Sequence, residues 1–572
     1  METILKTYDR WLKEATADPD LITELKAIQG KDNEIEDRFY KSLEFGTAGL
    51  RGVIGAGTNR MNVYTVGCAT QGLAEYVKQQ NPNGKVAIAY DSRIKSELFA
   101  RHAATVFAAN GLTVYIYPEL APTPMVSFAI RYFKCNTGVV VTASHNPAEY
   151  NGYKAYGPDG CQLNLEASAA VLDIIKKVDL FDGVKTCDFD EAVKAGKINF
   201  IGQDVVNAYL DAVFAQSVAD SSYHFENLKI IYTPLHGSGN KPVRAILKRL
   251  GVQNVTVVKE QELPDGNFPT APYPNPEIRQ VFEVGLKLAE QQKPDLLIAT
   301  DPDSDRMGIA VRQNGEYVLM TGNEVGILML NYLLARRSEL GTLPKDPIAV
   351  TTIVSTKMVQ KIAANYGCEL KEVLTGFKFI GEQILLLEQK HEENRFIMGF
   401  EESYGYMAGS YVRDKDAVVA SMLIAEMCCY YKDRGLTLID QLNKLYEQYG
   451  HYNNRQKSFT CAGMDGMEKM AAALAKLRKH PPKEIGGYPV TAVTDYQTSQ
   501  SVDLATGAVT PVTLPKSNVI AYTLQGGSTA TVRPSGTEPK IKIYISALAQ
   551  SSQKAAEITD QIELALAALL GL

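Results

Sequence analysis

Ser144 and His145 are the first residues in this chain whose types could do chemistry. They follow the apolar run 139–141, V-V-V, and lead into Asn146 and Pro147. A branched apolar run that ends in polar turn residues is typical of a buried strand whose carboxyl end opens into a loop, and open α/β sheets bind ligands at such ends. Ser144 is therefore a candidate nucleophile, although the pattern taken alone favours an ordinary polar turn.

The segment 300–306, T-D-P-D-S-D-R, places three carboxylates within five residues after an apolar run. Charges of one sign destabilise one another at this spacing unless a cation lies among them, and an all-oxygen set suits a hard ion such as Mg²⁺. An EF-hand calcium loop requires glycine at its sixth position and glutamate at its twelfth, whereas this chain has arginine at both. Asp301, Asp303 and Asp305 therefore predict a magnesium site, with a solvated acidic turn as the alternative.

Three further loops carry groups that could bind a ligand. The stretch 45–52, F-G-T-A-G-L-R-G, would place a guanidinium at a flexible glycine loop. The stretch 399–406, G-F-E-E-S-Y-G-Y, offers carboxylates and hydroxyls suited to sugar hydroxyl groups, and 531–540, T-V-R-P-S-G-T-E-P-K, has the composition of a phosphate-binding loop. The first also fits a glycine-rich turn with a solvated arginine, and the second fits a helix start. The chain lacks a nucleotide P-loop, a G-x-G-x-x-G fingerprint in a strand-to-helix turn and G-x-S-x-G at the serine, which disfavours nucleotide-binding enzymes and α/β-hydrolases.

The elements that must position these loops alternate between strands and helices. This alternation predicts mostly parallel sheets between helices in successive α/β domains. The composition changes near residues 451–458, and the helical and β-prone runs that follow predict a separate α+β domain. The strands are expected at 86–90, 113–117, 139–141, 228–232, 255–258, 296–299, 348–352 and 396–399. The four domains are expected at 1–205, 206–325, 326–450 and 451–572.

Length, charge and cysteine content limit the class of protein. A chain of 572 residues has room for several domains, because single cores stop growing near ~250–300 residues. The net charge of −6 offers no general attraction for nucleic acid, and no apolar run approaches the ~20 residues that span a bilayer. Eight cysteines without a C-x-x-C pair suit reduced thiols, and the N-terminus has the charge pattern of an amphipathic helix rather than a signal peptide. We predict a cytoplasmic protein that binds neither nucleic acid nor membranes; no pattern indicates its oligomeric state.

Taken together, the loops resemble the α-D-phosphohexomutase family, whose members interconvert 1- and 6-phosphosugars. Five motifs in the family's order, over nearly the whole chain, carry the resemblance: F-G-T-A-G-L-R-G, T-A-S-H-N-P, D-P-D-S-D-R, G-F-E-E-S-Y-G and R-P-S-G-T-E-P-K. They are most similar to the phosphoglucomutase-2-like branch, which includes phosphopentomutases. The resemblance implies three consecutive α/β domains with mixed sheets and a C-terminal α+β domain, similar to the TATA-binding protein, around a central cleft.

The resemblance also implies roles for individual residues. Ser144 would carry a phosphoryl group beside Mg²⁺, which the three aspartates of 301–305 would hold together with Ser144. Lys154 would take the proton of the attacking sugar hydroxyl, assisted by His145 and Arg51, and a lysine among cations could have a lowered pKa. Substrate-binding roles would fall to Arg306, Thr375, Gly376, Lys378, Glu401, Ser403, Lys415, Arg533, Ser535, Gly536 and Thr537.

The predicted activity is that of a phosphoglucomutase, which interconverts glucose 1-phosphate and glucose 6-phosphate through a phosphoserine and glucose 1,6-bisphosphate. Phosphopentomutase, phosphomannomutase and glucose 1,6-bisphosphate synthase activities are alternatives with the same chemistry. A non-catalytic sugar-phosphate-binding protein is an alternative of another class, but it would be expected to have lost the serine, the aspartates or the lysine, and this chain retains them all.

Overall fold

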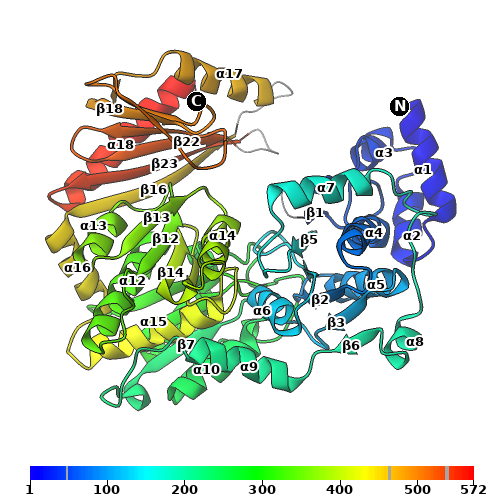
Figure 1. Ribbon diagram of the computed structural model, residues 1–572, viewed down its shortest axis with the longest axis horizontal. Coiled ribbons are helices and arrows are strands. Elements are labelled where there is room, and N and C mark those ends of the chain that lie inside the picture. Colours follow the sequence, from blue (N-terminus) through cyan, green and yellow to red (C-terminus); the bar gives the residue numbers. More distant parts are fainter. Residues whose placement is uncertain (47–48, 461–465, 535–539, 572) are drawn as a thin grey trace. The chain divides into compact units, whose positions relative to one another are not determined.

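The structure is a computed structural model that describes residues 1–46, 49–460, 466–534 and 540–571 (Figure 1). The chain divides into two compact units. Unit 1 comprises residues 1–321, 380–398 and 403–437, and unit 2 comprises residues 322–379, 399–402 and 438–572. Neither unit is therefore a single continuous stretch of sequence.

The first sheet of unit 1 has six strands in the order β1-β5-β4-β2-β3-β6. Its inner strands are parallel, whereas β1 and β5 are antiparallel to their neighbours, so the sheet is mixed. All five residues of β4 are buried, as expected for a strand covered on both faces. The strands are β1 (Gly49–Val53), β2 (Lys85–Tyr90), β3 (Thr113–Ile116), β4 (Thr137–Val141), β5 (Tyr150–Tyr156) and β6 (Ile198–Phe200).

Helices accompany this sheet in the predicted alternation. Asn62 caps α4 by accepting from the backbone N–H groups of Tyr64 and Thr65, which fixes where that helix begins. Apolar side chains of α1, α2, α3, α4 and α5 join the core of the sheet. The helices are α1 (Glu2–Glu14), α2 (Pro19–Ala27), α3 (Asp32–Phe39), α4 (Val63–Gln80), α5 (Ser96–Ala109), α6 (Thr123–Phe133), α7 (Leu165–Ile175), α8 (Phe189–Lys194) and α9 (Gln203–Phe214).

The second sheet of unit 1 is also mixed, with the order β11-β10-β9-β7-β8. β7 is parallel to β8 and β9, and β10 is antiparallel to β9 and β11. The turn between β9 and β10 is the acidic segment 301–306, which the two antiparallel strands hold at one edge. The elements are β7 (Lys229–Thr233), α10 (Asn240–Leu250), β8 (Asn254–Val257), α11 (Glu283–Gln292), β9 (Leu296–Thr300), β10 (Met307–Gln313) and β11 (Glu316–Met320).

A third sheet has the order β13-β12-β14-β15, with β12 and β13 parallel. Asp416 caps α15 by accepting from the backbone N–H groups of Val418 and Val419. The elements are α12 (Gly322–Glu339), β12 (Ile348–Thr352), α13 (Met358–Asn365), β13 (Glu369–Val373), α14 (Phe377–Glu388), β14 (Phe396–Glu401), β15 (Gly405–Ala408), α15 (Ala417–Lys432) and α16 (Leu438–Tyr449).

The C-terminal part of unit 2 is an antiparallel sheet with the order β16-β23-β22-β21-β18-β19-β20, and β17 pairs with β18. Apolar residues of α17 and α18 pack on this sheet to form its core (Figure 1). Within the described ranges, no helix is long and apolar enough to cross a membrane. The elements are β16 (His451–Thr460), α17 (Gly466–Lys479), β17 (Glu484–Ile485), β18 (Tyr488–Asp495), β19 (Gln500–Asp503), β20 (Val509–Pro511), β21 (Ile520–Leu524), β22 (Thr529–Pro534), β23 (Lys540–Ala549) and α18 (Ser552–Leu570).

Candidate active site

The serine loop follows β4 and contacts the acidic loop that follows β9. Ser144 is 4% exposed, and its Oγ lies 2.9 Å from Oδ2 of Asp301 and 3.1 Å from Nδ1 of His145. Burial, and then the positive charges of Arg306 and Arg51, lower the pKa of His145 well below its usual value. The imidazole is therefore neutral, and it can donate from Nδ1 to Ser144 while the serine hydroxyl donates to Asp301.

The three carboxylates of the acidic loop form one buried cluster. Asp301, Asp303 and Asp305 each offer an oxygen within 4.8 Å of the others. Burial, and then the charges of the two neighbours, raise the pKa of Asp301 well above its usual value. Among the described residues, Oδ1 of Asp303 and Oδ1 of Asp305 are buried without a hydrogen-bond partner. Clustered oxygens with unmet bonding capacity fit a hard divalent cation.

Two lysines lie against the same carboxylates. Lys154, on β5, places Nζ 2.7 Å from Oδ2 of Asp303 and 3.0 Å from Oδ2 of Asp305. Lys415 places Nζ 3.1 Å from the same oxygen of Asp305. Burial lowers the pKa of Lys154, but the charges of Asp303 and Asp305 outweigh it and raise the pKa above its usual value. The expectation of a lowered pKa is wrong for this arrangement, because the lysine faces carboxylates rather than other cations.

Three further predicted residues belong to unit 1. Arg306 donates from Nη1 to Oε1 of Glu277 at 2.7 Å, and its backbone N–H donates to Oδ1 of Asp301 at 3.0 Å. Arg51 lies on β1 and is exposed, and Ser403 is half-buried in the turn between β14 and β15. Arg306 thus holds the acidic loop through its backbone and adds positive charge beside it.

The remaining predicted site residues belong to unit 2. Gly376 follows β13 with a φ of 119°, and its N–H donates to Oε1 of the buried Glu401 at 2.9 Å. Thr375 and Lys378 flank this glycine and are half-buried. The loop 375–378 and the carboxylate at the end of β14 are therefore in direct contact.

Arg533 is half-buried on β22, which pairs with β23, the strand that carries Tyr544. Burial, and then the charge of Glu402, raise the pKa of Tyr544 to about 12. The predicted phosphate-binding residues Ser535, Gly536 and Thr537 lie outside the described residues, and their role stays a prediction.

Two residues of the site were not among those predicted from sequence. Thr123, the first residue of α6, donates from Oγ1 to Oδ2 of Asp303 at 2.8 Å and from its N–H to the backbone oxygen of Asp303 at 2.8 Å. Glu277 is the partner of Arg306 described above. A signal existed for Thr123, since it follows β3 in the way that Ser144 follows β4, at the edge where α/β sheets bind ligands.

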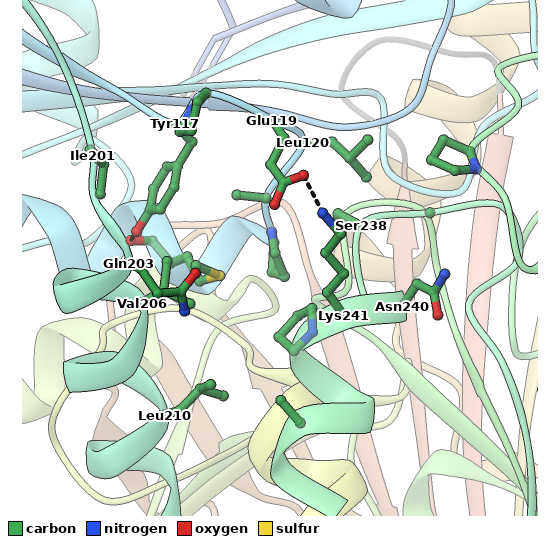
Figure 2. A pocket seen from close by; sticks show the side chains of 18 of the residues that line it. Tyr117, Glu119, Leu120, Ile201, Gln203, Val206, Leu210, Ser238, Asn240 and Lys241 are labelled. Atoms are coloured by element: carbon green, nitrogen blue, oxygen red, sulfur yellow. Dashed lines mark hydrogen bonds and ion pairs between the residues drawn. The ribbon is translucent and has the colours of Figure 1, made fainter. Parts of the chain in front are cut away.

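Figure 2 shows a separate cavity of about 450 Å³ in unit 1, between the segments 117–125 and 237–245. Apolar side chains such as Leu120, Val206 and Leu210 predominate in its lining, and Glu119 forms an ion pair with Lys241 beside it. Among the described residues that line the cavity, none is a predicted site residue. The cavity therefore lies outside the candidate active site.

Comparison with known proteins finds one family along the chain. All four domains of the phosphoglucomutase/phosphomannomutase family match this chain. Alpha/beta/alpha domain I matches residues 42–181, domain II matches 207–315, domain III matches 321–449 and the C-terminal domain matches 468–565. These matches confirm the predicted fold class of three α/β domains and a C-terminal domain.

Individual proteins are similar over nearly the full length. The phosphoglucomutase of Staphylococcus aureus (strain USA300) is 36% identical over 559 residues, which cover 96% of this chain and 97% of that protein. The phosphoglucomutase of Staphylococcus saprophyticus is 35% identical over 526 residues, covering 92% and 93%. The structure of parafusin (phosphoglucomutase) from Paramecium, an open form, shares 18% identity with a TM-score of 0.68, covering 93% of this chain and 96% of that one. At that identity the structural likeness concerns the fold.

Proposed function

Because the chain belongs to the phosphoglucomutase/phosphomannomutase family, and is thus an isomerase of the phosphohexomutase type, we propose that it interconverts glucose 1-phosphate and glucose 6-phosphate. We further propose that Mg²⁺ and glucose 1,6-bisphosphate serve as cofactors and that the enzyme works in the cytoplasm. The observation that carries the proposal is the contact of Ser144 Oγ with Asp301 within a buried triad of carboxylates.

In the proposed reaction Ser144 first donates a phosphoryl group to the sugar and then accepts one back from it. The oxygen of a free sugar hydroxyl attacks the phosphorus of phosphorylated Ser144, so the bond to Oγ breaks as the new ester bond forms and a bisphosphate results. The bisphosphate then reorients in the site. Oγ of Ser144 attacks the phosphorus of its other phosphate group, and the second monophosphate leaves. The hydroxyl proton released in the first step returns to the leaving sugar oxygen in the second, so no net proton is consumed.

Residues of unit 1 would surround the transferring group. Asp301, Asp303 and Asp305 would hold the metal, which supplies positive charge against the phosphoryl oxygens. The backbone N–H groups of Asp305 and Arg306 donate to Oδ1 of Asp301 and keep its Oδ2 directed at Ser144. His145, neutral and 3.1 Å from Oγ, would orient the serine oxygen.

Lys154 is the proposed proton acceptor for the sugar hydroxyl. Its raised pKa means that it is charged while it pairs with Asp303 and Asp305, so its first effect is to attract the sugar phosphate. It can accept a proton only where the charge of those carboxylates is neutralised. Lys415 supplies a second cation at Asp305.

Residues of unit 2 carry groups suited to a sugar and to a phosphate. Glu401 would accept hydrogen bonds from sugar hydroxyl groups, and the loop 375–378 that it contacts would limit which sugar fits. Arg533 would bind the phosphate that is not transferred, together with residues 535–537. A carboxylate for hydroxyl groups and a guanidinium for phosphate favour a sugar phosphate over an uncharged sugar.

Steady-state rates with glucose 1-phosphate, mannose 1-phosphate and ribose 1-phosphate, with and without glucose 1,6-bisphosphate, test this proposal. The highest kcat/KM is expected with glucose 1-phosphate, and the bisphosphate should shorten the lag before turnover. A higher kcat/KM with ribose 1-phosphate or mannose 1-phosphate would show that this sugar phosphate, and not glucose 1-phosphate, is the preferred substrate. Transfer from a bisphosphoglycerate without mutase turnover would identify a synthase, and binding without turnover would identify a sugar-phosphate-binding protein.

A further inference from the structure

Arg93 is a buried arginine that contacts the backbone of the serine loop. It lies just beyond the carboxyl end of β2, and none of its side chain is exposed. Nη2 donates to the backbone oxygen of Ser144 at 2.6 Å and to that of Asn146. Nη1 donates to the backbone oxygens of Pro147 at 2.9 Å and Tyr150 at 3.0 Å. One guanidinium thus holds four carbonyl groups of the segment 144–150.

The guanidinium is itself fixed from two sides. Its Nε lies 3.4 Å from Oδ2 of Asp91, which also accepts from Oγ1 of Thr142 at 2.6 Å. Its Cζ lies over the ring of Phe268, 5.0 Å from the ring centroid. Oγ1 of Thr142 in turn accepts from the backbone N–H of Ser144 at 2.8 Å. The serine is therefore linked to Arg93 through its carbonyl group and, by way of Asp91, through its N–H group.

The serine loop requires such support because of its backbone. Ser144 has a φ of 52°, in the left-handed region of the backbone that residues other than glycine rarely adopt. Such a conformation persists only where surrounding contacts impose it. The planar guanidinium presents five N–H donors in a fixed fork, which a lysine ammonium cannot reproduce.

We propose that Arg93 is a positioning residue that imposes the left-handed backbone of Ser144 and so directs its Oγ at Asp301. The residue does not touch the reacting atoms; it acts by holding backbone carbonyl groups of the loop. The inference rests on the proposed function for its kinetic consequence, whereas its structural consequence, the order of the segment 144–150, is independent of any activity.

The first test compares the wild type with Arg93→Lys. Because a catalytic group misplaced by about 1 Å can lose 10²-fold in rate, kcat for glucose 1-phosphate is expected to fall about 100-fold or more. KM is expected to stay within about threefold, because the hydrogen bonds of Arg93 go to the backbone of the serine loop and not to the residues proposed to bind the sugar. Hydrogen exchange read by mass spectrometry should show faster exchange of amides in 144–150.

The second test is chemical rescue. Arg93→Ala leaves space for a guanidinium ion, and millimolar guanidinium or methylguanidinium chloride should restore part of kcat, whereas ammonium chloride at equal ionic strength should not. Arg336→Lys is the matched control, since Arg336 is also a buried arginine and pairs with Glu339 within its own helix in unit 2. That variant should leave both kcat and the exchange of 144–150 at wild-type values.

The outcomes separate this inference from the proposed function. A folded Arg93→Lys variant with kcat within threefold of wild type and unchanged exchange in 144–150 would overturn the inference. So would global unfolding of that variant, because the arginine would then serve stability rather than the loop. If the wild type lacks mutase turnover, the proposed function fails, and faster exchange confined to 144–150 in Arg93→Lys would still support the positioning role.

Discussion

The hydroxyl of Thr123 offers a test of the metal site that leaves every proposed ligand in place. Thr123 is fully buried, and its Oγ1 donates to Oδ2 of Asp303 at 2.8 Å. Thr123→Val keeps the shape of the side chain and removes this bond. A hydrogen bond to a charged group contributes about 1.5–3 kcal/mol. Loss of a partner that orients a metal ligand typically costs about 10- to 100-fold in metal affinity, which is about 1.4–2.7 kcal/mol and agrees with the bond's value.

The assay is mutase turnover as a function of Mg²⁺ concentration. We expect the half-saturating Mg²⁺ concentration of Thr123→Val to rise about 10- to 100-fold, while kcat at saturating Mg²⁺ stays near the wild-type value. Thr137→Val is the matched control, because Thr137 is equally buried and donates to the backbone oxygen of Tyr156 at 2.7 Å. A half-saturating concentration within twofold of wild type in folded Thr123→Val, or an equal rise in the control, would refute the reasoning.

Further predictions concern the acidic loop, Lys154, the proposed sugar site and the stability of the fold at low pH. Asp305→Asn removes a proposed ligand, so turnover should fall at least 100-fold and not recover at high Mg²⁺; full recovery in the titration would contradict this. Lys154→Arg keeps a cation but cannot accept a proton, so it should lower kcat while KM stays closer to wild type than in Lys154→Met; equal KM values for the two variants would argue against the attracting role. Glu401→Ala should raise KM for glucose 1-phosphate at least tenfold, and an unchanged KM would remove Glu401 from the sugar site. Hydrogen bonding by Arg131 lowers the pKa of Glu388 from 4.5 to about 2, so this carboxylate stabilises the fold fully above pH 4.5 and less as the pH falls toward 2. The Tm difference between the wild type and Glu388→Gln should therefore shrink over that interval; a constant difference would count against the ion pair.

Strand positions were readable from the sequence where an apolar run meets a polar loop. The predicted strand 348–352 coincides with β12, and the predicted 86–90 and 296–299 differ by one residue from β2 and β9. These strands are buried along nearly their whole length, so an apolar run marks both of their ends.

β16 shows why other elements were missed. The change of composition near 451–458 was used to predict a domain boundary, and no strand was predicted there; the structure has one long strand, His451–Thr460, at the edge of the C-terminal sheet. Several of its residues are exposed, so polar side chains are tolerated there. The sequence therefore has no apolar run that would predict the strand. Its pairing with β23 is a tertiary contact that local sequence does not encode.

Some residues of the candidate site could also be predicted from the local sequence, and others could not. The serine and the three aspartates were predicted because each group follows an apolar strand pattern with residue types suited to phosphoryl transfer. Thr123 and Arg93 were missed because their partners lie 180 and 51 residues away in the chain, and only folding brings those partners into contact. The direction of the pKa change of Lys154 was missed for the same reason, since it depends on carboxylates from a different sheet.

Phosphate on Ser144 is the central claim, and mass spectrometry tests it most directly. The wild type is incubated with glucose 1,6-bisphosphate, and intact mass and peptide mapping locate any phosphoryl group. We predict one phosphoryl group on the peptide that contains Ser144, its loss when excess glucose 6-phosphate is added, and neither phosphate nor turnover in Ser144→Ala. Full turnover by Ser144→Ala, or wild-type turnover with phosphate located only on another residue, would contradict the account.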